Sequence, residues 1–124
     1  MKKNNKDFLR IQKQVWENYT RYLIINEGTS VQLELHNQTA WFGGKAFIYA
    51  LWTDPEYRRK GYAEKLMRVA ENIAFDHGHE VVFLEWNNAN KRHVLDWYHR
   101  IGYVDMGHPR GYLLLSKILK EKKK

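Results

Sequence analysis

Hydrophobic and polar residues alternate through the segment from residue 22 to residue 36. Residues 22–27 (YLIINE) and 30–36 (SVQLELH) predict two strands, because successive side chains of a strand point to opposite faces. Gly28 and Thr29 would join them as a two-residue turn, in which the glycine accepts a positive φ. We therefore expect a β-hairpin whose second strand buries one face.

A different spacing precedes this hairpin. Over residues 5–19 the apolar positions fall three or four residues apart, as on one face of an amphipathic helix. These positions are Phe8, Ile11, Val15 and Tyr19. The pattern predicts a first helix over residues 5–19 and no clear strand before it.

The rest of the chain alternates between strand and helix patterns. Residues 46–53 (AFIYALWT) form a nearly continuous apolar run, which predicts a strand buried on both faces. The next helix has an apolar stripe of Leu66, Ala70 and Ile73, and we expect Glu64, Lys65, Arg68, Glu71 and Asn72 to face away from it. The later elements are a stop at Gly78, a strand over 81–86, a helix from about Asn90 to Gly102 and a strand over 112–118. This order predicts an α/β layered domain.

Length and composition narrow the class of protein. A chain of 124 residues suffices for one core, so we expect a single domain over 1–124. The absence of cysteine excludes disulfides, thiolate zinc sites and a cysteine nucleophile, and it fits the cytoplasm, where we expect the protein. None of the six histidines forms a ligand pair such as HExxH, so we expect no metal. The longest apolar run has seven residues, against about 20 for a membrane span, and no secretory signal is expected.

The formal charge of +7 lies at the two ends. Residues 7–116 carry equal numbers of basic and acidic side chains, and the excess falls in residues 1–6 and 117–124. We expect basic, frayed ends at 1–5 and 119–124. A small nucleic-acid-binding domain is the less favoured alternative, because such domains place basic stripes on ordered elements.

Chemistry is suggested by residues 54–67, DPEYRRKGYAEKLM. A strand ends, a proline interrupts it, three basic residues and Gly61 follow, and a helix begins at once. The first turn of a helix has backbone N–H groups without partners and the positive end of the helix dipole. Small side chains at Gly61 and Ala63 would let an anion approach these groups. The segment therefore predicts a phosphate cradle, although a solvated basic face is the alternative.

The pattern Arg58-x-x-Gly61-x-Ala63 resembles the Q/R-x-x-G-x-G/A signature of the GNAT superfamily of N-acetyltransferases. The order of elements around it and the later Tyr98-x-x-x-Gly102-Tyr103 are also similar to that family, over about residues 45–118. The resemblance implies a mixed, mostly antiparallel central sheet flanked by helices, with a shortened N-terminal part where the family builds its acceptor groove. It also implies acetyl-coenzyme A as the co-substrate.

The resemblance further implies roles for individual residues. The backbone of Leu51, Trp52 and Thr53 would bind the pantetheine arm. The pyrophosphate would lie on the loop and first helical turn, formed by Arg58, Arg59, Lys60, Gly61, Tyr62, Ala63 and Glu64. Asn90 would contact pantetheine, although the family's usual asparagine position holds Lys91, and Asn87 or Asn88 are alternatives.

Catalytic candidates come next. Tyr98 matches the tyrosine that protonates the departing thiolate in many family members; the alternative is a core aromatic residue. Glu85, near the end of a buried strand, is our first candidate for the proton acceptor, and a glutamate that only reaches solvent is the alternative. Glu34 and His36 are weaker candidates. Aromatic residues that would line an acceptor pocket, or else belong to the core, are Trp41, Phe42, Trp52 and Trp86.

We therefore expect an N-acetyltransferase that moves an acetyl group to a primary amine by direct attack. The acceptor would be a small molecule or a peptide, with no nucleic acid or membrane partner, and the protein a monomer or homodimer. The alternative is a non-catalytic acyl-coenzyme A-binding sensor or partner module.

Overall fold

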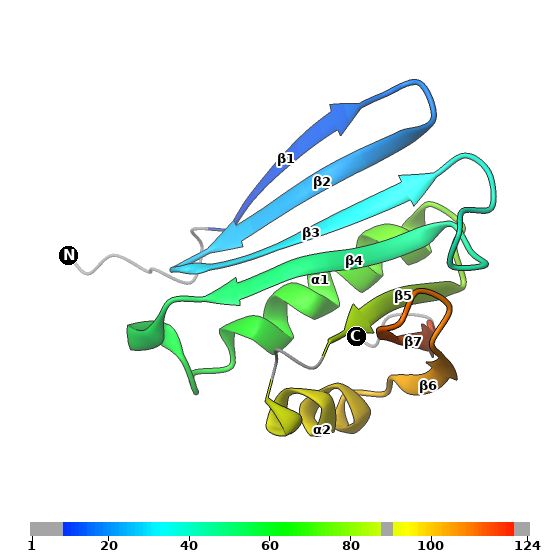
Figure 1. The fold of residues 1–124 in the computed structure, drawn as a ribbon. Coiled ribbons are helices and arrows are strands. Elements are labelled where there is room, and N and C mark those ends of the chain that lie inside the picture. The colour runs from blue at the N-terminus through cyan, green and yellow to red at the C-terminus, as the bar shows by residue number, and fades with distance from the viewer. Residues whose placement is uncertain (1–8, 88–90, 121–124) are drawn as a thin grey trace.

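A computed structural model describes residues 9–87 and 91–120, which form a seven-stranded sheet and two α-helices (Figure 1). The strand order is β1-β2-β3-β4-β5-β7-β6, and every neighbouring pair is antiparallel except β4 and β5. The predicted mixed, mostly antiparallel sheet is confirmed. The elements are β1 (Arg10–Val15), β2 (Tyr19–Asn26), β3 (Thr29–His36), β4 (Ala46–Thr53), the 3-10 turn η2 (Pro55–Tyr57), α1 (Tyr62–Asp76), β5 (Val81–Trp86), α2 (Arg92–Arg100), β6 (Val104–Gly107) and β7 (Leu113–Ile118).

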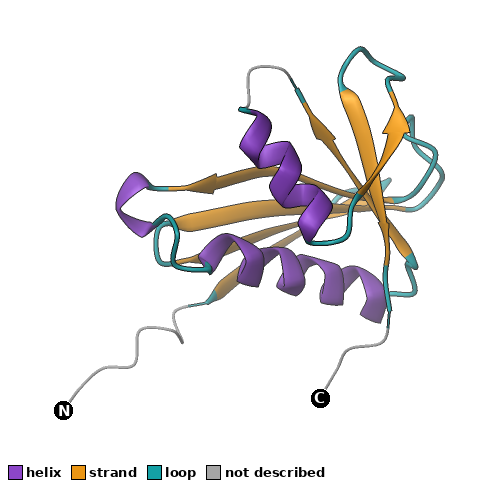
Figure 2. Cartoon of the chain, turned by 90° about the horizontal axis from the view of Figure 1, so that it is seen from below, coloured by secondary structure: helices purple, strands orange, loops and turns teal. Residues whose placement is uncertain are grey.

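The main core lies between one face of this sheet and the two helices (Figure 2). Alternate residues of β2 and β3 are buried toward α1, which supplies Leu66, Met67 and Ala70, and α2 adds Leu95 and Tyr98. No described helix covers the other side of β2, β3 and β4, which faces the viewer in Figure 1. We call this side, with its continuation on β5, the open face; among its side chains are Tyr19, Arg21, Gln32, Glu34, His36, Phe47, Tyr49, Phe83 and Glu85.

The predicted first helix is wrong. Residues 10–15 form β1, which pairs antiparallel with β2, and Tyr19 begins β2; Phe8 lies outside the described residues. The spacing of four between Ile11 and Val15 is an even number, so it fits one face of a strand as well as one face of a helix. Both residues are β-branched, which favours the strand. The described N-terminal part therefore supplies two strands and no helix.

The hairpin between β2 and β3 is confirmed, but its turn lies one residue earlier than predicted. Asn26 pairs with Thr29, so the turn residues are Glu27 and Gly28, with φ of 47° and 76°. A two-residue turn of this kind needs positive φ at both positions, which the β-branched Thr29 resists. Gly28 also lies against η2: a Cβ there would lie 2.3 Å from Tyr57 Cδ2, and the Asp54 amide donates to Gly28 O at 2.8 Å.

Strand β4 is found where predicted, but it is not buried on both faces. Ala46 and Ile48 are buried, whereas Ala50 and Trp52 are exposed. The pairing with β3 shifts register at this point, and Ala50 takes the left-handed conformation, with φ of 57°. This β-bulge bends the second half of β4, as bulges do.

Two further predictions need correction, and one strand was not predicted. Glu71 does not face solvent: it is buried, accepts a hydrogen bond from the Tyr103 hydroxyl at 2.8 Å and pairs with Lys117 Nζ at 3.0 Å. The C-terminal end is ordered through Leu119, which is buried and whose amide donates to Glu80 O at 2.8 Å. The predicted frayed segment 1–5 and residues 121–124 lie outside the described residues. Strand β6 was not predicted, because it has only four residues and these are mostly exposed.

The helices over 62–76 and 92–100 and the strand over 81–86 agree with the predictions, and Gly78 follows α1 with φ of 90°. Within the described ranges, neither helix is long and apolar enough to cross a membrane.

Candidate active site

The site forms where two parallel strands separate. β4 and β5 pair only at Ala46–Val82 and Phe47–Phe83, and beyond these pairs the bulge at Ala50 directs β4 away from β5. A cleft of about 310 Å³ opens between them. Its lining residues are Phe47, Ile48, Tyr49, Ala50, Leu51, Leu84, Glu85, Asn87, Tyr98 and Tyr112. Because the strands no longer pair, the edge of β4 near Leu51 is available to a ligand's amide groups.

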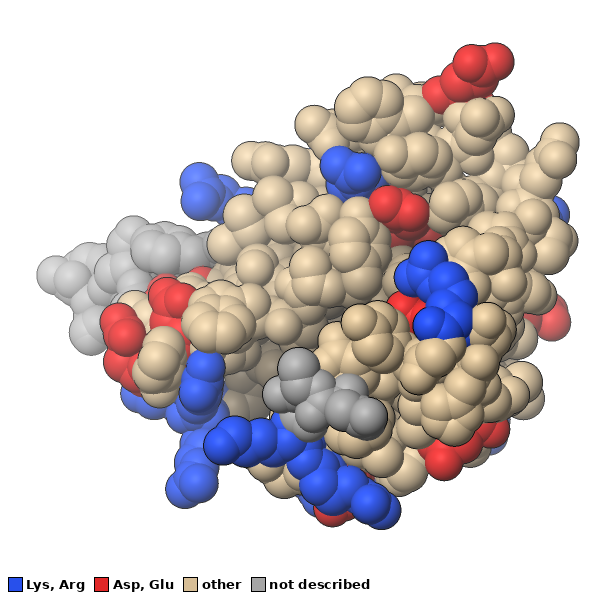
Figure 3. Space-filling view, viewed as in Figure 1, with Lys and Arg blue, Asp and Glu red and all other residues tan. Residues whose placement is uncertain are grey.

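The basic loop lies at the end of β4, before α1. Gly61 precedes the helix with φ of 80°, and Arg59 also has a positive φ, of 65°. Apart from residues 60–62, no described residue would come within 4 Å of a Cβ added at Gly61, so the space outside this residue is open among the described residues. The exposed cations Arg58, Arg59 and Lys60 directly precede it in the chain, and Figure 3 shows Lys and Arg side chains at the lower left of the molecule, where Figure 1 places this loop. These features fit the predicted anion cradle at a helix N-terminus.

Two of the predicted loop residues make polar side-chain contacts within the chain. Arg58 Nε donates to Thr53 O at 3.0 Å, which links the loop to the end of β4. Glu64 pairs with Arg68 at 2.7 Å on the surface of α1. Tyr62 and Ala63 form the first turn of α1, where backbone N–H groups have no partner within the helix.

Tyr98 reaches the cleft from α2. Its side chain is buried and belongs to the main core, yet the residue also lines the cleft. Burial raises the pKa of its phenol to about 12. The phenol is therefore protonated at neutral pH and can donate a proton or a hydrogen bond. Tyr98 thus packs in the core and also lines the cleft, and its role as proton donor to the thiolate stays a prediction.

Glu85 lines the same cleft from β5, on the open face, with 13% of its side chain exposed. Its carboxylate is paired with Arg110, from the segment between β6 and β7: Nη2 lies 3.1 Å from Oε1 and Nε lies 3.4 Å from Oε2. The guanidinium of Arg110 also lies over the ring of Trp41, 3.7 Å from its centroid. Sequence reasoning did not find Arg110, because no local pattern relates it to residues 25 and 69 positions earlier.

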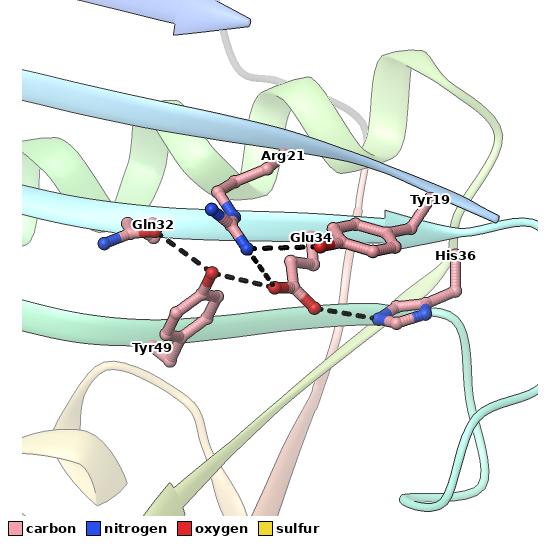
Figure 4. A network of polar contacts seen from close by, with 6 residues as sticks. All are labelled: Tyr19, Arg21, Gln32, Glu34, His36 and Tyr49. Carbon is pink, nitrogen blue, oxygen red and sulfur yellow. Dashed lines mark hydrogen bonds and ion pairs between the residues drawn. The ribbon is translucent and has the colours of Figure 1, made fainter. Parts of the chain in front are cut away.

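A polar network occupies the open face of β2, β3 and β4 (Figure 4). The Glu34 carboxylate accepts a hydrogen bond from the Tyr49 hydroxyl at 2.8 Å, lies 3.0 Å from His36 Nε2 and lies 3.7 Å from Arg21 Nη2. Burial, followed by the hydrogen bond to Glu34, raises the pKa of Tyr49 to about 12. Since Tyr49 also lines the cleft, its hydroxyl connects the candidates Glu34 and His36 to the site.

The remaining candidates are spread over several places. Trp52 is exposed and its indole N–H donates to Asp54 at 2.8 Å, whereas Trp86 packs against the main core. Phe42 is buried in a small cluster with Phe83 and Leu114. Asn87 lines the cleft, but Asn88 and Asn90 lie outside the described residues.

Among the described residues, no three or more of His, Asp and Glu form a group that could hold a metal ion.

Acetyltransferases are among the solved structures with a similar fold. The PaiA N-acetyltransferase from Thermoplasma acidophilum, in complex with coenzyme A, aligns with a TM-score of 0.65 and 18% identity over 82% of this chain and 62% of that one. The Bacillus subtilis acetyltransferase in complex with coenzyme A aligns with a TM-score of 0.65 and 13% identity over 90% and 99% of the two chains. A GNAT-family acetyltransferase from Staphylococcus aureus Mu50 aligns with a TM-score of 0.65 and 12% identity over 82% of this chain and 68% of that one.

The chain thus spans less than two thirds of the Thermoplasma protein, and these low identities compare folds alone. No curated protein matched the sequence. A search against protein families matched residues 15–103, more than half of the chain, to the acetyltransferase (GNAT) family. The chain therefore belongs to the acetyltransferase (GNAT) family.

Proposed function

We propose that this protein binds acetyl-coenzyme A and transfers the acetyl group to a primary amine. The observation that carries the proposal is the position of β4: the part of it that does not pair with β5 lines the cleft together with the buried Tyr98, and the loop with the open space at Gly61 follows its end. Two of the neighbouring structures contain coenzyme A, which supports this substrate.

Coenzyme A would bind with its pyrophosphate on the loop from Arg58 to Gly61 and the first turn of α1. There the backbone N–H groups, the helix dipole and three cations attract negative charge. The pantetheine arm would pass into the cleft, where its amides hydrogen-bond the edge of β4 near Leu51. The thioester would then lie between Tyr98 and Glu85, the two titratable groups that reach the cleft from α2 and β5.

The reaction needs proton acceptance on one side of the thioester and proton donation on the other. An alkylammonium with a pKa of about 10.4 must lose a proton before its nitrogen can attack. We assign this proton to the Glu85 carboxylate. The nitrogen then forms a bond to the carbonyl carbon, the carbon–sulfur bond breaks, and the Tyr98 phenol donates a proton to the thiolate. Overall the ammonium loses two protons, of which one ends on the thiol and one in solvent.

The proposal is tested by isothermal titration with acetyl-coenzyme A, followed by a panel of primary amines in which free thiol is measured. We expect saturable binding and amine-dependent thiol release. Binding without release by any amine would favour the sensor module over the enzyme. Absence of binding would refute the proposed function altogether.

A further inference from the structure

Arg110 contacts two groups, and these two groups together form a site that would bind a cation. The Glu85 carboxylate contacts two nitrogens of its guanidinium, at 3.1 and 3.4 Å. The Trp41 ring lies against the same group, with its centroid 3.7 Å away. A carboxylate and the face of a tryptophan are the two protein groups that attract ammonium and guanidinium ions most strongly.

The two contacting groups are held in place independently of Arg110. Trp41 packs edge-to-face on Phe42 and Phe47, with centroid distances of 5.4 and 5.5 Å. Glu85 lies within β5, paired in register with Leu114 of β7. Removal of the Arg110 side chain would therefore leave a carboxylate and an aromatic face at the edge of the cleft.

Arg110 itself is the part of this arrangement that can move. Its side chain is 54% exposed, against 13% for Glu85, so it covers the carboxylate from the solvent side. The segment that carries it is bounded by Gly107 and Gly111, with φ of 123° and 92°. Exposed ion pairs and exposed cation–π contacts are weak, so a competing cation can displace the guanidinium.

We propose that Arg110 occupies, within the chain, the site of the acceptor's protonated amine, and that the acceptor displaces it to reach Glu85. The inference rests on the proposed function and narrows the acceptor to one that presents a cationic amine to Glu85 and Trp41. The opposite role, in which Arg110 binds an acidic group of the acceptor, is disfavoured because Glu85 already neutralises its charge.

The test is a binding experiment that needs no catalysis. The indole N–H signal of Trp41, identified by its loss in Trp41→Phe, is followed by NMR while n-butylammonium is added. We expect Arg110→Gln to bind this ion about three- to tenfold more tightly than wild type, because the internal competitor is gone. Arg100→Gln, an exposed arginine of α2 that does not line the cleft, is the matched control and should titrate like wild type.

Two results would overturn the proposal. One is equal or weaker n-butylammonium binding in Arg110→Gln; the other is binding of butyrate to wild type that is lost in Arg110→Gln. The double variant Glu85→Gln, Arg110→Gln should lose the gain in affinity, and a retained gain would also contradict the assignment. If an active amine is known, its KM should fall in Arg110→Gln by a similar factor while the Kd of acetyl-coenzyme A stays constant. A protein that acetylates no amine would refute the proposed function, and the titration would still decide the role of Arg110.

Discussion

The substitution Gly61→Ala tests the anion loop most directly. Gly61 has a φ of 80°, and an alanine in this left-handed conformation costs about 1–2 kcal/mol. For a domain of this size, such a loss lowers Tm by roughly 3–8 °C. Apart from residues 60–62, no described residue comes within 4 Å of the new methyl group, so the substitution adds no clash with other parts of the fold. The methyl group instead enters the space proposed for the pyrophosphate.

The expected loss of affinity follows from the hydrogen bonds at this place. One hydrogen bond between a backbone N–H and a charged group is worth about 1.5–3 kcal/mol. Its loss would raise the Kd of acetyl-coenzyme A about 10- to 150-fold, which isothermal titration measures readily.

Gly78→Ala is the matched control, because Gly78 follows the other end of α1 with φ of 90° and a Cβ there also meets nothing within 4 Å. It should lower Tm by the same amount and leave the Kd unchanged. A Kd for Gly61→Ala within twofold of wild type would refute the anion loop. An equal loss of affinity in both variants would show that affinity follows the stability of α1 instead.

Three further substitutions have expected outcomes. Tyr98→Phe should lower kcat about 10- to 1000-fold, because the proton donor is lost, and should barely move the Kd of acetyl-coenzyme A or the Tm; unchanged kcat would leave Tyr98 as a core residue only. Ala50→Val places a β-branched residue at φ of 57°, so it should destabilise the fold by about 2 kcal/mol and weaken acetyl-coenzyme A binding, whereas Ala50→Gly should do neither. Glu71→Ala leaves Tyr103 and Lys117 unpaired and should lower the free energy of unfolding by about 2–4 kcal/mol in urea titrations, with a smaller loss for Glu71→Gln; equal stability of all three proteins would contradict the buried pair.

The sequence predicted those features that depend on local pattern. Alternation placed Val31, Leu33 and Leu35 on the buried face of β3, and helical spacing together with Gly78 gave the extent of α1. The position of Gly61 just before a helix is predictable for the same reason, because a glycine accepts the positive φ found there. The strand β3, the helix α1 and the position of the Gly61 loop before α1 were therefore predictable from the sequence.

The features that were missed depend on tertiary structure. The spacing of Ile11 and Val15 fits two periods, and only the pairing with β2 decides between them. No residue in the apolar run over 46–53 indicates a β-bulge at Ala50, although this bulge opens the cleft. Arg110 contacts Glu85 and Trp41 only because β7 pairs with β5. This pairing brings the segment that precedes β7, and Arg110 within it, next to β5. Side-chain pairing of this kind follows from topology and not from spacing.

The close approach of Gly28 to Tyr57 links the β2–β3 hairpin to the loop that follows β4. The amide of Asp54 is bonded to the carbonyl of Gly28, and no side chain fits between that glycine and the tyrosine ring. Local opening of the loop must therefore break contacts with the hairpin end, and the two segments open and close as one cooperative unit. A ligand held by the loop would stabilise the hairpin end by the same linkage, although no hairpin residue lines the cleft between β4 and β5. In this way β2 and β3 would contribute to the lifetime of the proposed bound state from a place remote from the chemistry.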